Sequence, residues 1–195
     1  MARAQFVKAL EEVSPEDRIY ADECGCDDRL QREHGWSPCG EICVGTRVGH
    51  ATERLSVVAA WQAACGEPVS GEPVSGEPVS GEPVSGEPVS GKTALIAALS
   101  FDGTCHSRLF ELWLRVMLCP LLRAGQVLIL DNARFHRKKA VQRILKKVGC
   151  HALFLPAYSP DLNPIEHQWH SLKTQVRTHR LRGMQFKQAL ESALT

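Results

Sequence analysis

The sequence predicts an α/β protein built on a mixed β-sheet with helices on both faces. Two observations lead to this prediction. At least three strand-like stretches follow one another before residue 102, and consecutive strands favour antiparallel hairpins. After residue 104, helix-like and strand-like stretches alternate, which favours parallel crossovers. The 195 residues, 44% of them hydrophobic, are sufficient for one domain with a core of its own.

The strands of the first half are indicated by short apolar runs. The first of these runs leads directly into an acidic pair, Asp22-Glu23. The run RLSVVAAW is apolar enough for a central strand. The stretches expected to form strands are Arg18–Cys24, Ile42–Val48, Arg54–Trp61 and Thr93–Phe101.

The N-terminal residues 1–17 are expected to form a helix that precedes a domain spanning residues 18–195. Phe6, Val7 and Leu10 recur there at helical spacing. No stretch is apolar enough over a sufficient length for a membrane span. Because a signal-peptide apolar region and cleavage site are also missing, we expect a cytoplasmic protein with reduced cysteines.

Residues 66–90 are five tandem copies of Gly-Glu-Pro-Val-Ser. Proline at every fifth position is incompatible with a regular helix or an inner strand. We expect an extended, disordered insert at the tip of a hairpin, where added length costs little. Five of the 22 acidic residues lie in this insert, and the other 17 against 23 basic residues leave six excess positive charges. Most of the basic residues lie in the C-terminal half.

The second half alternates helices and strands. Gly149 is a natural C-cap for the second helix, and Asn163 is expected to cap the third, with Pro164 at its first position. The expected elements are a helix from Thr104 or Ser107 to about Pro120, a strand at Val127–Leu130, a helix at Phe135–Val148, a strand at Ala152–Leu155, and helices at Pro164–Thr178 and Met184–Leu194.

The helix that begins at Pro164 has two distinct faces. Spacing by four, three and four residues predicts a buried face of Ile165, Trp169, Leu172 and Val176. The same spacing gives a second face with an acid in the first turn and basic residues after it: Glu166, His170, Lys173 and Arg177. This second face suits a metal site beside a phosphate backbone, or alternatively an ordinary solvated helix surface.

Three acids lie at the ends of separate elements: Asp22, Asp131 and Glu166. Each has an ordinary alternative as a helix cap, a dipole partner or a solvated strand end. Together they point to a shared site, because clustered carboxylates repel each other unless cations lie between them. Oxygen ligands of this kind suit Mg²⁺ or Mn²⁺.

These stretches also resemble a known family. The segments YADECG, GWSPCGE, LILDNARFH and LPAYSPDLNPIEHQWHSLK are similar to DDE transposases of bacterial insertion sequences, in the mariner superfamily and insertion-sequence family six-thirty. The 34 residues between Asp131 and Glu166 match the spacing of that superfamily. The resemblance covers the chain from about Arg18, apart from the repeat. It implies a ribonuclease H-like fold.

The resemblance further implies an enzyme. Asp22, Asp131 and Glu166 would be its catalytic residues and would bind two Mg²⁺ or Mn²⁺ ions, about 4 Å apart in such sites. The reaction would be cleavage of DNA at transposon ends, followed by strand transfer into target DNA. A homodimer and a location at the nucleoid are further expectations from the family.

Basic residues near the acids are candidates for contacts with DNA phosphates, which position DNA without reading its sequence. For each of them, a solvated surface charge is the alternative. The candidates are Arg134, His136, Arg137, Lys138, Lys173 and Arg177. Asp161 is interpreted as a turn-forming residue and not as the third acid of the site.

Two other functions remain open at this stage. Family members begin with helix-turn-helix modules, and the segment before Arg18 is too short for them, so the chain could be an inactive remnant that binds DNA weakly. A zinc-binding structural module is the other alternative, with Cys24, Cys26, Cys39 and Cys43 and with His34 between the pairs. Cys65, Cys105, Cys119 and Cys150 are interpreted as scattered core thiols.

Overall fold

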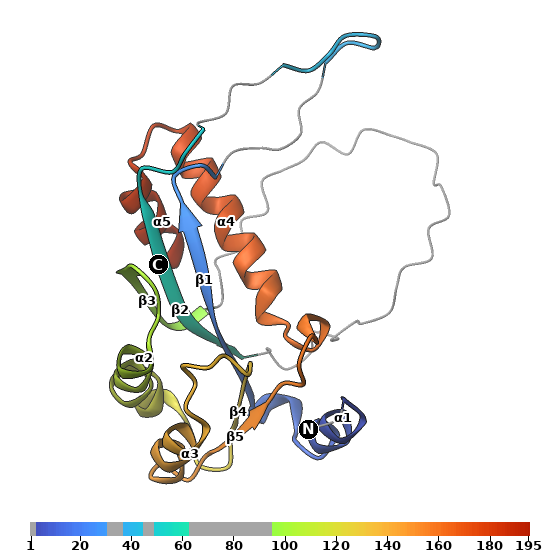
Figure 1. Cartoon of the computed structure of the whole chain (residues 1–195), viewed down its shortest axis with the longest axis vertical. Helices are drawn as coiled ribbons and strands as arrows, with labels where there is room; N and C mark the ends of the chain where they lie inside the picture. The colour runs from blue at the N-terminus through green and yellow to red at the C-terminus, as the bar shows by residue number, and fades with distance from the viewer. Residues whose placement is uncertain (1–2, 31–36, 45–48, 63–94) are drawn as a thin grey trace.

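The computed structural model describes residues 3–30, 37–44, 49–62 and 95–195. In these ranges a five-stranded sheet has the strand order β3-β2-β1-β4-β5 (Figure 1). Neighbours pair antiparallel among β1, β2 and β3, whereas β4 pairs in parallel with both β1 and β5. The strands are β1 (Arg18–Asp27), β2 (Arg54–Gln62), β3 (Leu95–Asp102), β4 (Val127–Leu130) and β5 (His151–Phe154). The predicted mixed sheet is confirmed.

Helices cover both faces of this sheet, as expected. They are α1 (Arg3–Glu11), α2 (Ser107–Trp113), α3 (Lys138–Lys146), α4 (Ile165–Leu181) and α5 (Phe186–Leu194). α2 continues through a π-helical turn, Leu114–Leu118, into a 3-10 turn, Cys119–Leu121. α3 begins three residues later than the sequence pattern predicts, because residues 134–136 form a turn first. None of the helices in the described ranges has both the length and the apolar character that a membrane crossing needs.

Alternating side chains of β1 divide the core into two parts. Tyr20 and Cys24 face α4 and α5, whereas Ile19 and Ala21 face α2 and α3. The predicted buried face of α4 is confirmed, since its buried residues are Ile165, Trp169, Leu172 and Val176. The strand alternation therefore also sends Asp22 and Glu23 to opposite faces of the sheet.

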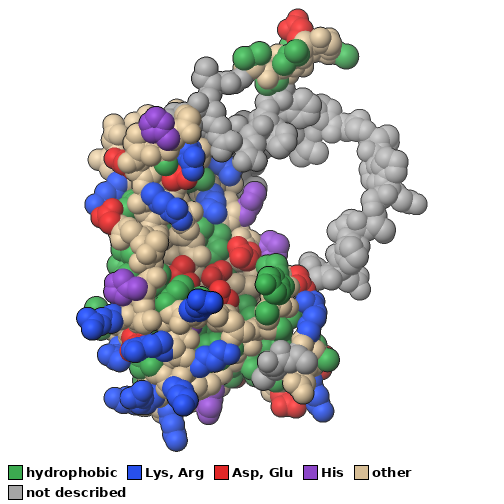
Figure 2. Space-filling model, viewed as in Figure 1, with side chains coloured by type: hydrophobic (Ala, Val, Ile, Leu, Met, Phe, Trp, Pro, Cys, Tyr) green, Lys and Arg blue, Asp and Glu red, His purple; other side chains and the backbone are tan. Residues whose placement is uncertain are grey.

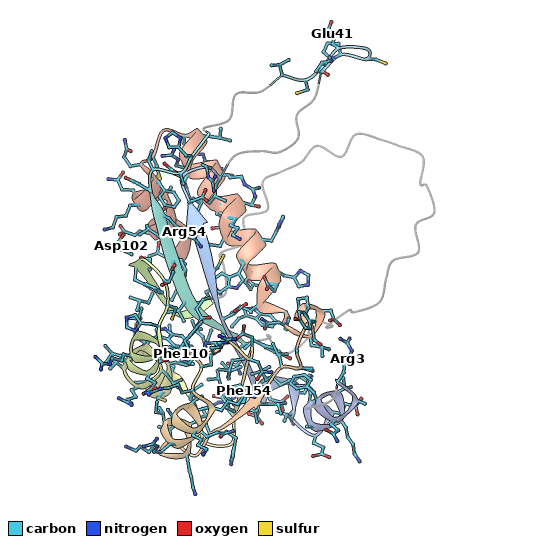
Figure 3. All side chains as sticks on the ribbon, viewed as in Figure 1. Arg3, Glu41, Arg54, Asp102, Phe110 and Phe154 are labelled. Carbon is cyan, nitrogen blue, oxygen red and sulfur yellow. The ribbon has the colours of Figure 1, made fainter. Side chains whose placement is uncertain are left out.

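The N-terminal helix α1 packs onto the same unit. Phe6 is fully buried in the core on the α4 side. Arg18 at the start of β1 donates a hydrogen bond from Nη2 to the carbonyl oxygen of Leu10, with 2.9 Å between the atoms. Figure 3 shows Arg3 extending from α1 toward the turn before α4, where it pairs with Asp161.

One predicted strand is wrong in the part that the structure describes. Ile42, Cys43 and Val44 form no strand, and Ile42 and Val44 have exposed fractions of 88% and 87%. Side chains as exposed as those of Ile42 and Val44 do not pack on a strand of the described ranges. Residues 45–48 of the same stretch lie outside the described residues, as does the repeat at 66–90. The strands that flank the repeat do pair as a hairpin, with Trp61 opposite Leu95.

Gly149 lies in the turn after α3, two residues beyond the C-cap Lys147 and not at the cap itself as predicted. Its φ of +73° lies in the left-handed region that favours glycine. A Cβ atom at this position would also lie 3.0 Å from the Cβ atom of Ala124. The turn therefore requires glycine for both backbone conformation and space.

Candidate active site

The sheet register brings the first two acids together. In the parallel pair of β1 and β4, Ala21 lies opposite Leu130. Asp22 follows Ala21 in β1 and Asp131 follows Leu130 at the end of β4, so the two acids occupy neighbouring positions where β4 ends. Acids at the carboxyl end of a strand in an open α/β sheet lie where ligand sites usually form.

The third acid comes from the first turn of α4, which packs on β1. Glu166 shares one hollow of about 190 Å³ with Asp22 and Asp131. We call it the acidic hollow, and its other lining residues are Leu155, Pro156, Ser159, Pro160 and Asn163. In Figure 2, acidic side chains gather near the centre of the visible face, and Lys and Arg side chains lie below them. The three acids predicted to act together are thus brought together.

Asp22 is held by three donors. Its Oδ2 accepts hydrogen bonds from Asn163 Nδ2 at 3.0 Å and from Trp169 Nε1 at 3.3 Å. Its Oδ1 accepts from the backbone N–H of Glu23 at 2.8 Å. Burial raises the pKa of Asp22 to about 7, and the nearby carboxylates of Glu23 and Glu166 add to this rise, while the bonds from the Glu23 backbone and Trp169 oppose it.

Asn163 has a role different from the predicted one. The N-cap of α4 is Pro164, with no hydrogen bond from its side chain, and the Asn163 side chain binds Asp22 instead. The backbone carbonyl of Asn163 accepts from the N–H of Glu166 at 3.1 Å. Asn163 Oδ1 is buried and has no hydrogen-bond partner among the described residues. The predicted cap residue is therefore part of the acidic hollow.

Asp131 is held on one oxygen. Its Oδ1 accepts from the Ala133 backbone N–H at 2.9 Å and lies 2.8 Å from His136 Nδ1. Burial alone would raise the pKa of Asp131, but these two interactions outweigh it and lower the pKa below its ordinary value.

His136 does not lie where a phosphate contact would require. Its side chain is fully buried, and its Nε2 lies 2.9 Å from Glu23 Oε1 while Nδ1 faces Asp131. Burial lowers the pKa of His136, but the two carboxylates outweigh it and raise the pKa to about 9. With both nitrogens engaged inside the protein, the expectation that His136 contacts DNA is wrong.

The other five candidates for phosphate contacts form two groups. Arg134, Arg137 and Lys138 are exposed around the start of α3. Lys173 and Arg177 are half-buried on α4. Lys173 lies close to the thiols of β1, where a hydrogen bond from Cys26 and the charge of Lys173 lower the pKa of Cys24. The structure therefore leaves the α3 group as the solvent-facing one.

A second, larger hollow of about 580 Å³ lies between α2 and α3. We call it the basic hollow, and its lining residues are Glu111, Arg115, Arg137, Lys138, Lys139, Ala140, Arg143, Ile144 and Lys147. Its one acid, Glu111, is buried and pairs with Arg137 and Arg115. Six basic side chains around one neutralised acid make this surface strongly positive.

The donors of the acidic hollow fit a hard divalent cation in kind. Three carboxylates and the unpaired amide oxygen of Asn163 are oxygen ligands of the type that Mg²⁺ and Mn²⁺ prefer. The acids line the hollow without converging on a point: within the described ranges, no three His, Cys, Asp or Glu side chains are gathered closely enough to hold an ion.

The cysteines and Asp161 have other positions. Cys24 and Cys26 are buried in the sheet, whereas Cys39 and Cys43 are exposed, so the structure does not gather the two pairs of the zinc hypothesis. His34 lies outside the described residues. Cys119 and Cys150 are buried, as expected of core thiols, and Cys105 is partly buried. Asp161 lies in the 3-10 turn before α4, exposed and bonded to Arg3, which agrees with its interpretation as a turn residue.

Sequence reasoning missed Glu23, and took Trp169 for a core residue alone. Trp169 is 2% exposed, so it does belong to the core, but its indole N–H also binds Asp22. For Glu23 a signal was present, since strand alternation puts it on the face opposite Asp22. For Trp169 the sequence contained no comparable signal.

Parts of this chain are similar to known proteins. Residues 89–187 match the family described as DDE superfamily endonuclease, a span that includes Asp131 and Glu166. The transposable element Tc1 transposase of Caenorhabditis elegans is 32% identical over 75 residues, which are 38% of this chain and 28% of that protein.

Solved structures agree with the fold. The Mos1 transposase paired-end complex with left transposon end matches 88% of this chain and 45% of its own, with a TM-score of 0.57 and 14% identity. The Mos1 strand transfer complex matches 87% of this chain and 46% of its own, with a TM-score of 0.58 and 17% identity. The mixed sheet is thus that of the ribonuclease H-like catalytic cores.

The chain spans less than half the length of these relatives. The family match nevertheless covers half of the chain and contains two of the three acids of the hollow. This chain belongs to the DDE superfamily of endonucleases.

Proposed function

We propose that the chain is the catalytic domain of a Tc1/mariner-type transposase, of the kind found in bacterial insertion-sequence family six-thirty. Its reaction is cleavage of DNA phosphodiesters at transposon ends and transfer of the cut strand into target DNA. One observation carries the proposal: Asp22, Asp131 and Glu166, from three separate elements, line a single hollow at the end of a parallel strand pair.

Phosphoryl transfer requires little covalent chemistry from a protein, so positioning and charge stabilisation dominate. Asp22, Asp131 and Glu166 are the residues that would hold Mg²⁺ or Mn²⁺. When bound, two such ions supply an activated water or 3′-hydroxyl and stabilise the leaving oxygen. One of the Mos1 structures similar in fold, with a TM-score of 0.53, is described as a complex with Mn.

The contribution of the chain itself is a fixed frame for the acids. Asn163 and Trp169 orient the Asp22 carboxylate, and Ala133 orients that of Asp131. Glu166 stands exposed on the first turn of α4, where the helix dipole favours a negative charge. Two acids are therefore fixed and the third can adjust to the substrate.

DNA is the proposed partner, and the basic hollow is its proposed docking surface. Arg137 and Lys138 follow Asp131 by only six and seven residues and line this hollow, so a bound backbone would continue from it toward the acids. Four further basic residues line it: Arg115, Lys139, Arg143 and Lys147. Contacts of this kind supply affinity that depends on salt and not on sequence.

The proposal can be tested with supercoiled plasmid DNA, whose nicking is visible without knowledge of the terminal sequences. We expect the wild-type chain to nick the plasmid in Mn²⁺ and to lose this activity on addition of a chelator. Asp131→Ala and Glu166→Ala should both abolish nicking.

Asp161→Ala is the matched control, because Asp161 lies in the turn before α4 but outside the acidic hollow. It should nick DNA like the wild type. Nicking that survives both Asp131→Ala and Glu166→Ala would refute the proposal. A wild-type chain that binds DNA but never nicks it would favour an inactive remnant.

A further inference from the structure

A buried histidine connects one acid of the hollow to an acid outside it. His136 Nδ1 lies 2.8 Å from Asp131 Oδ1, and His136 Nε2 lies 2.9 Å from Glu23 Oε1. The imidazole side chain has no exposed surface, and the Glu23 side chain is 14% exposed. The three groups form a continuous bridge from Asp131, which lines the acidic hollow, to Glu23, which does not.

The imidazole ring is fixed by packing as well as by hydrogen bonds. Its centroid lies 4.2 Å from that of Phe110 on α2 and 4.4 Å from that of Phe135. Figure 3 shows Phe110 on the α2 side of the sheet, which is the side that Glu23 faces. Aromatic contacts on this scale favour particular ring orientations. Packing and polar contacts thus hold the ring with Nδ1 toward Asp131 and Nε2 toward Glu23.

Glu23 contacts His136 in this bridge and does not line the acidic hollow. The β1 alternation directs Asp22 toward α4 and Glu23 toward the opposite face, and Glu23 does not line the acidic hollow. A carboxylate can only accept hydrogen bonds, so each ring nitrogen of His136 acts as a donor. Glu23 consequently fixes the ring so that Nδ1 points to Asp131.

The bond from His136 falls on a particular oxygen. Oδ1 of Asp131 accepts from the Ala133 backbone N–H and lies 2.8 Å from His136 Nδ1, which also lies 3.4 Å from the backbone carbonyl oxygen of Asp131. Two donors on one oxygen oppose rotation of the carboxylate and leave Oδ2 for the hollow. Loss of a residue that hydrogen-bonds a metal ligand typically lowers metal affinity or activity by about 10- to 100-fold.

We propose that His136 and Glu23 are positioning residues: Glu23 orients the His136 ring, and His136 holds Asp131 with Oδ2 directed into the acidic hollow. The catalytic consequence rests on the proposed function, but the bridge can be measured without it.

The bridge itself can be observed by NMR of the whole chain labelled with ¹⁵N-histidine. Among the eight histidines, one ring should show two N–H protons that exchange slowly with water. His136→Asn should remove both signals and so assign them. Asp131→Ala should release the Nδ1 proton and Glu23→Ala the Nε2 proton. Fast exchange of both protons, or signals that neither variant changes, would overturn the inference.

The positioning role can be separated from a merely structural one by two amide substitutions. An asparagine amide can replace the Nδ1 donor to Asp131, and a glutamine amide can replace the Nε2 donor to Glu23. We expect His136→Gln to weaken Mn²⁺ binding by about tenfold or more. His136→Asn should retain most of it. Mn²⁺ binding is measured as the metal concentration that gives half of the metal-induced shift in melting temperature. His151→Asn, at an exposed histidine on β5, is the control.

The outcomes distinguish this inference from the proposed function. A chain that shows the bridge and binds Mn²⁺ as predicted but does not cut DNA would refute the function and leave the inference intact. Equal Mn²⁺ affinities in His136→Gln and wild type, or equal losses in His136→Gln and His136→Asn, would refute the positioning role. A bridge without any Mn²⁺ binding by the wild type would refute it as well.

Discussion

The two hollows of this molecule are built in opposite ways. The acidic hollow takes its charges from short side chains at the ends of buried elements, and hydrogen bonds hold two of the three acids. The basic hollow takes its charges from long side chains on α3, on the turns before and after it and on the π-helical turn after α2, and its one acid, Glu111, is buried. Two acids of the first hollow are held by their surroundings, whereas the basic side chains of the second are exposed to solvent.

The difference corresponds to what each surface would do. Phosphoryl transfer needs atoms held in place, since a small misplacement lowers the rate steeply. Attraction of a DNA backbone needs only a positive surface of the right extent, because many weak phosphate contacts add together. Substitutions should therefore have large, specific effects in the acidic hollow and small, additive effects in the basic one.

The largest effect is expected for Asp22→Asn. Loss of a charged metal ligand should remove several kcal/mol of transition-state stabilisation, or about a thousandfold in nicking rate. Binding of DNA in the absence of Mn²⁺, measured by gel shift, should stay within about twofold, because phosphate contacts supply the affinity. Asp27→Asn, farther along the same strand and paired with Arg29, is the control and should cut normally. A parallel loss of binding and cutting in Asp22→Asn would contradict the division between the hollows.

An intermediate effect is expected for Trp169→Phe, which keeps an aromatic ring in the core but removes the donor to Asp22. The nicking rate should fall by about 10- to 100-fold. Trp61→Phe changes the same core by the same type of substitution and controls for packing. If both variants lose activity equally, packing and not the indole N–H is responsible.

These two variants concern residues that the sequence reveals to different degrees. Strand and helix periodicity predicts most of the elements of the mixed sheet, the buried face of α4 and the three acids at element ends, because each depends on residues close together in the chain. The bonds of Asp22 to Asn163 and Trp169 join residues 141 and 147 positions apart, and local patterns contain no trace of them.

The errors of the sequence analysis have the same origin. Asn163 resembles a helix cap because it precedes Pro164, yet the folded chain presents its amide to Asp22. His136 resembles a surface residue because basic residues follow it, yet Phe110 and Glu23 from distant segments enclose it. In both cases tertiary neighbours decide between two roles that the local sequence permits.

A smaller effect is expected when the basic hollow loses charge. Replacing Lys139, Arg143 and Lys147 with alanine should weaken binding to all duplexes alike. The slope of log affinity against log salt should decrease by about one for each phosphate that the protein no longer neutralises. The nicking rate at saturating DNA should remain close to wild type. Lys187→Ala on α5 removes an exposed charge far along the chain from this hollow and serves as the control. Loss of the saturated rate in the triple variant would show that the two surfaces are not independent.

The smallest functional effect is expected for Gly149→Ala, at the turn that follows α3. The left-handed backbone and the close approach to Ala124 should cost about 1–3 kcal/mol of stability. A loss of that size lowers Tm by roughly 2–4 °C per kcal/mol. The nicking rate below the melting transition should not change. Gly183→Ala has a similar φ but an open position, so the difference between the two variants measures the cost of crowding against Ala124. Equal melting temperatures in the two would mean that this crowding costs nothing.

The unequal lengths of the strands have a further consequence. β1 and β2 continue past the level at which β4 and β5 stop, so the sheet has a step, and Asp22 and Asp131 stand at its inner corner. An ion or a phosphate that reaches this corner breaks no hydrogen bond of the sheet. The sheet can thus remain unchanged through every stage of the proposed reaction, and adjustment is left to Glu166 on the first turn of α4.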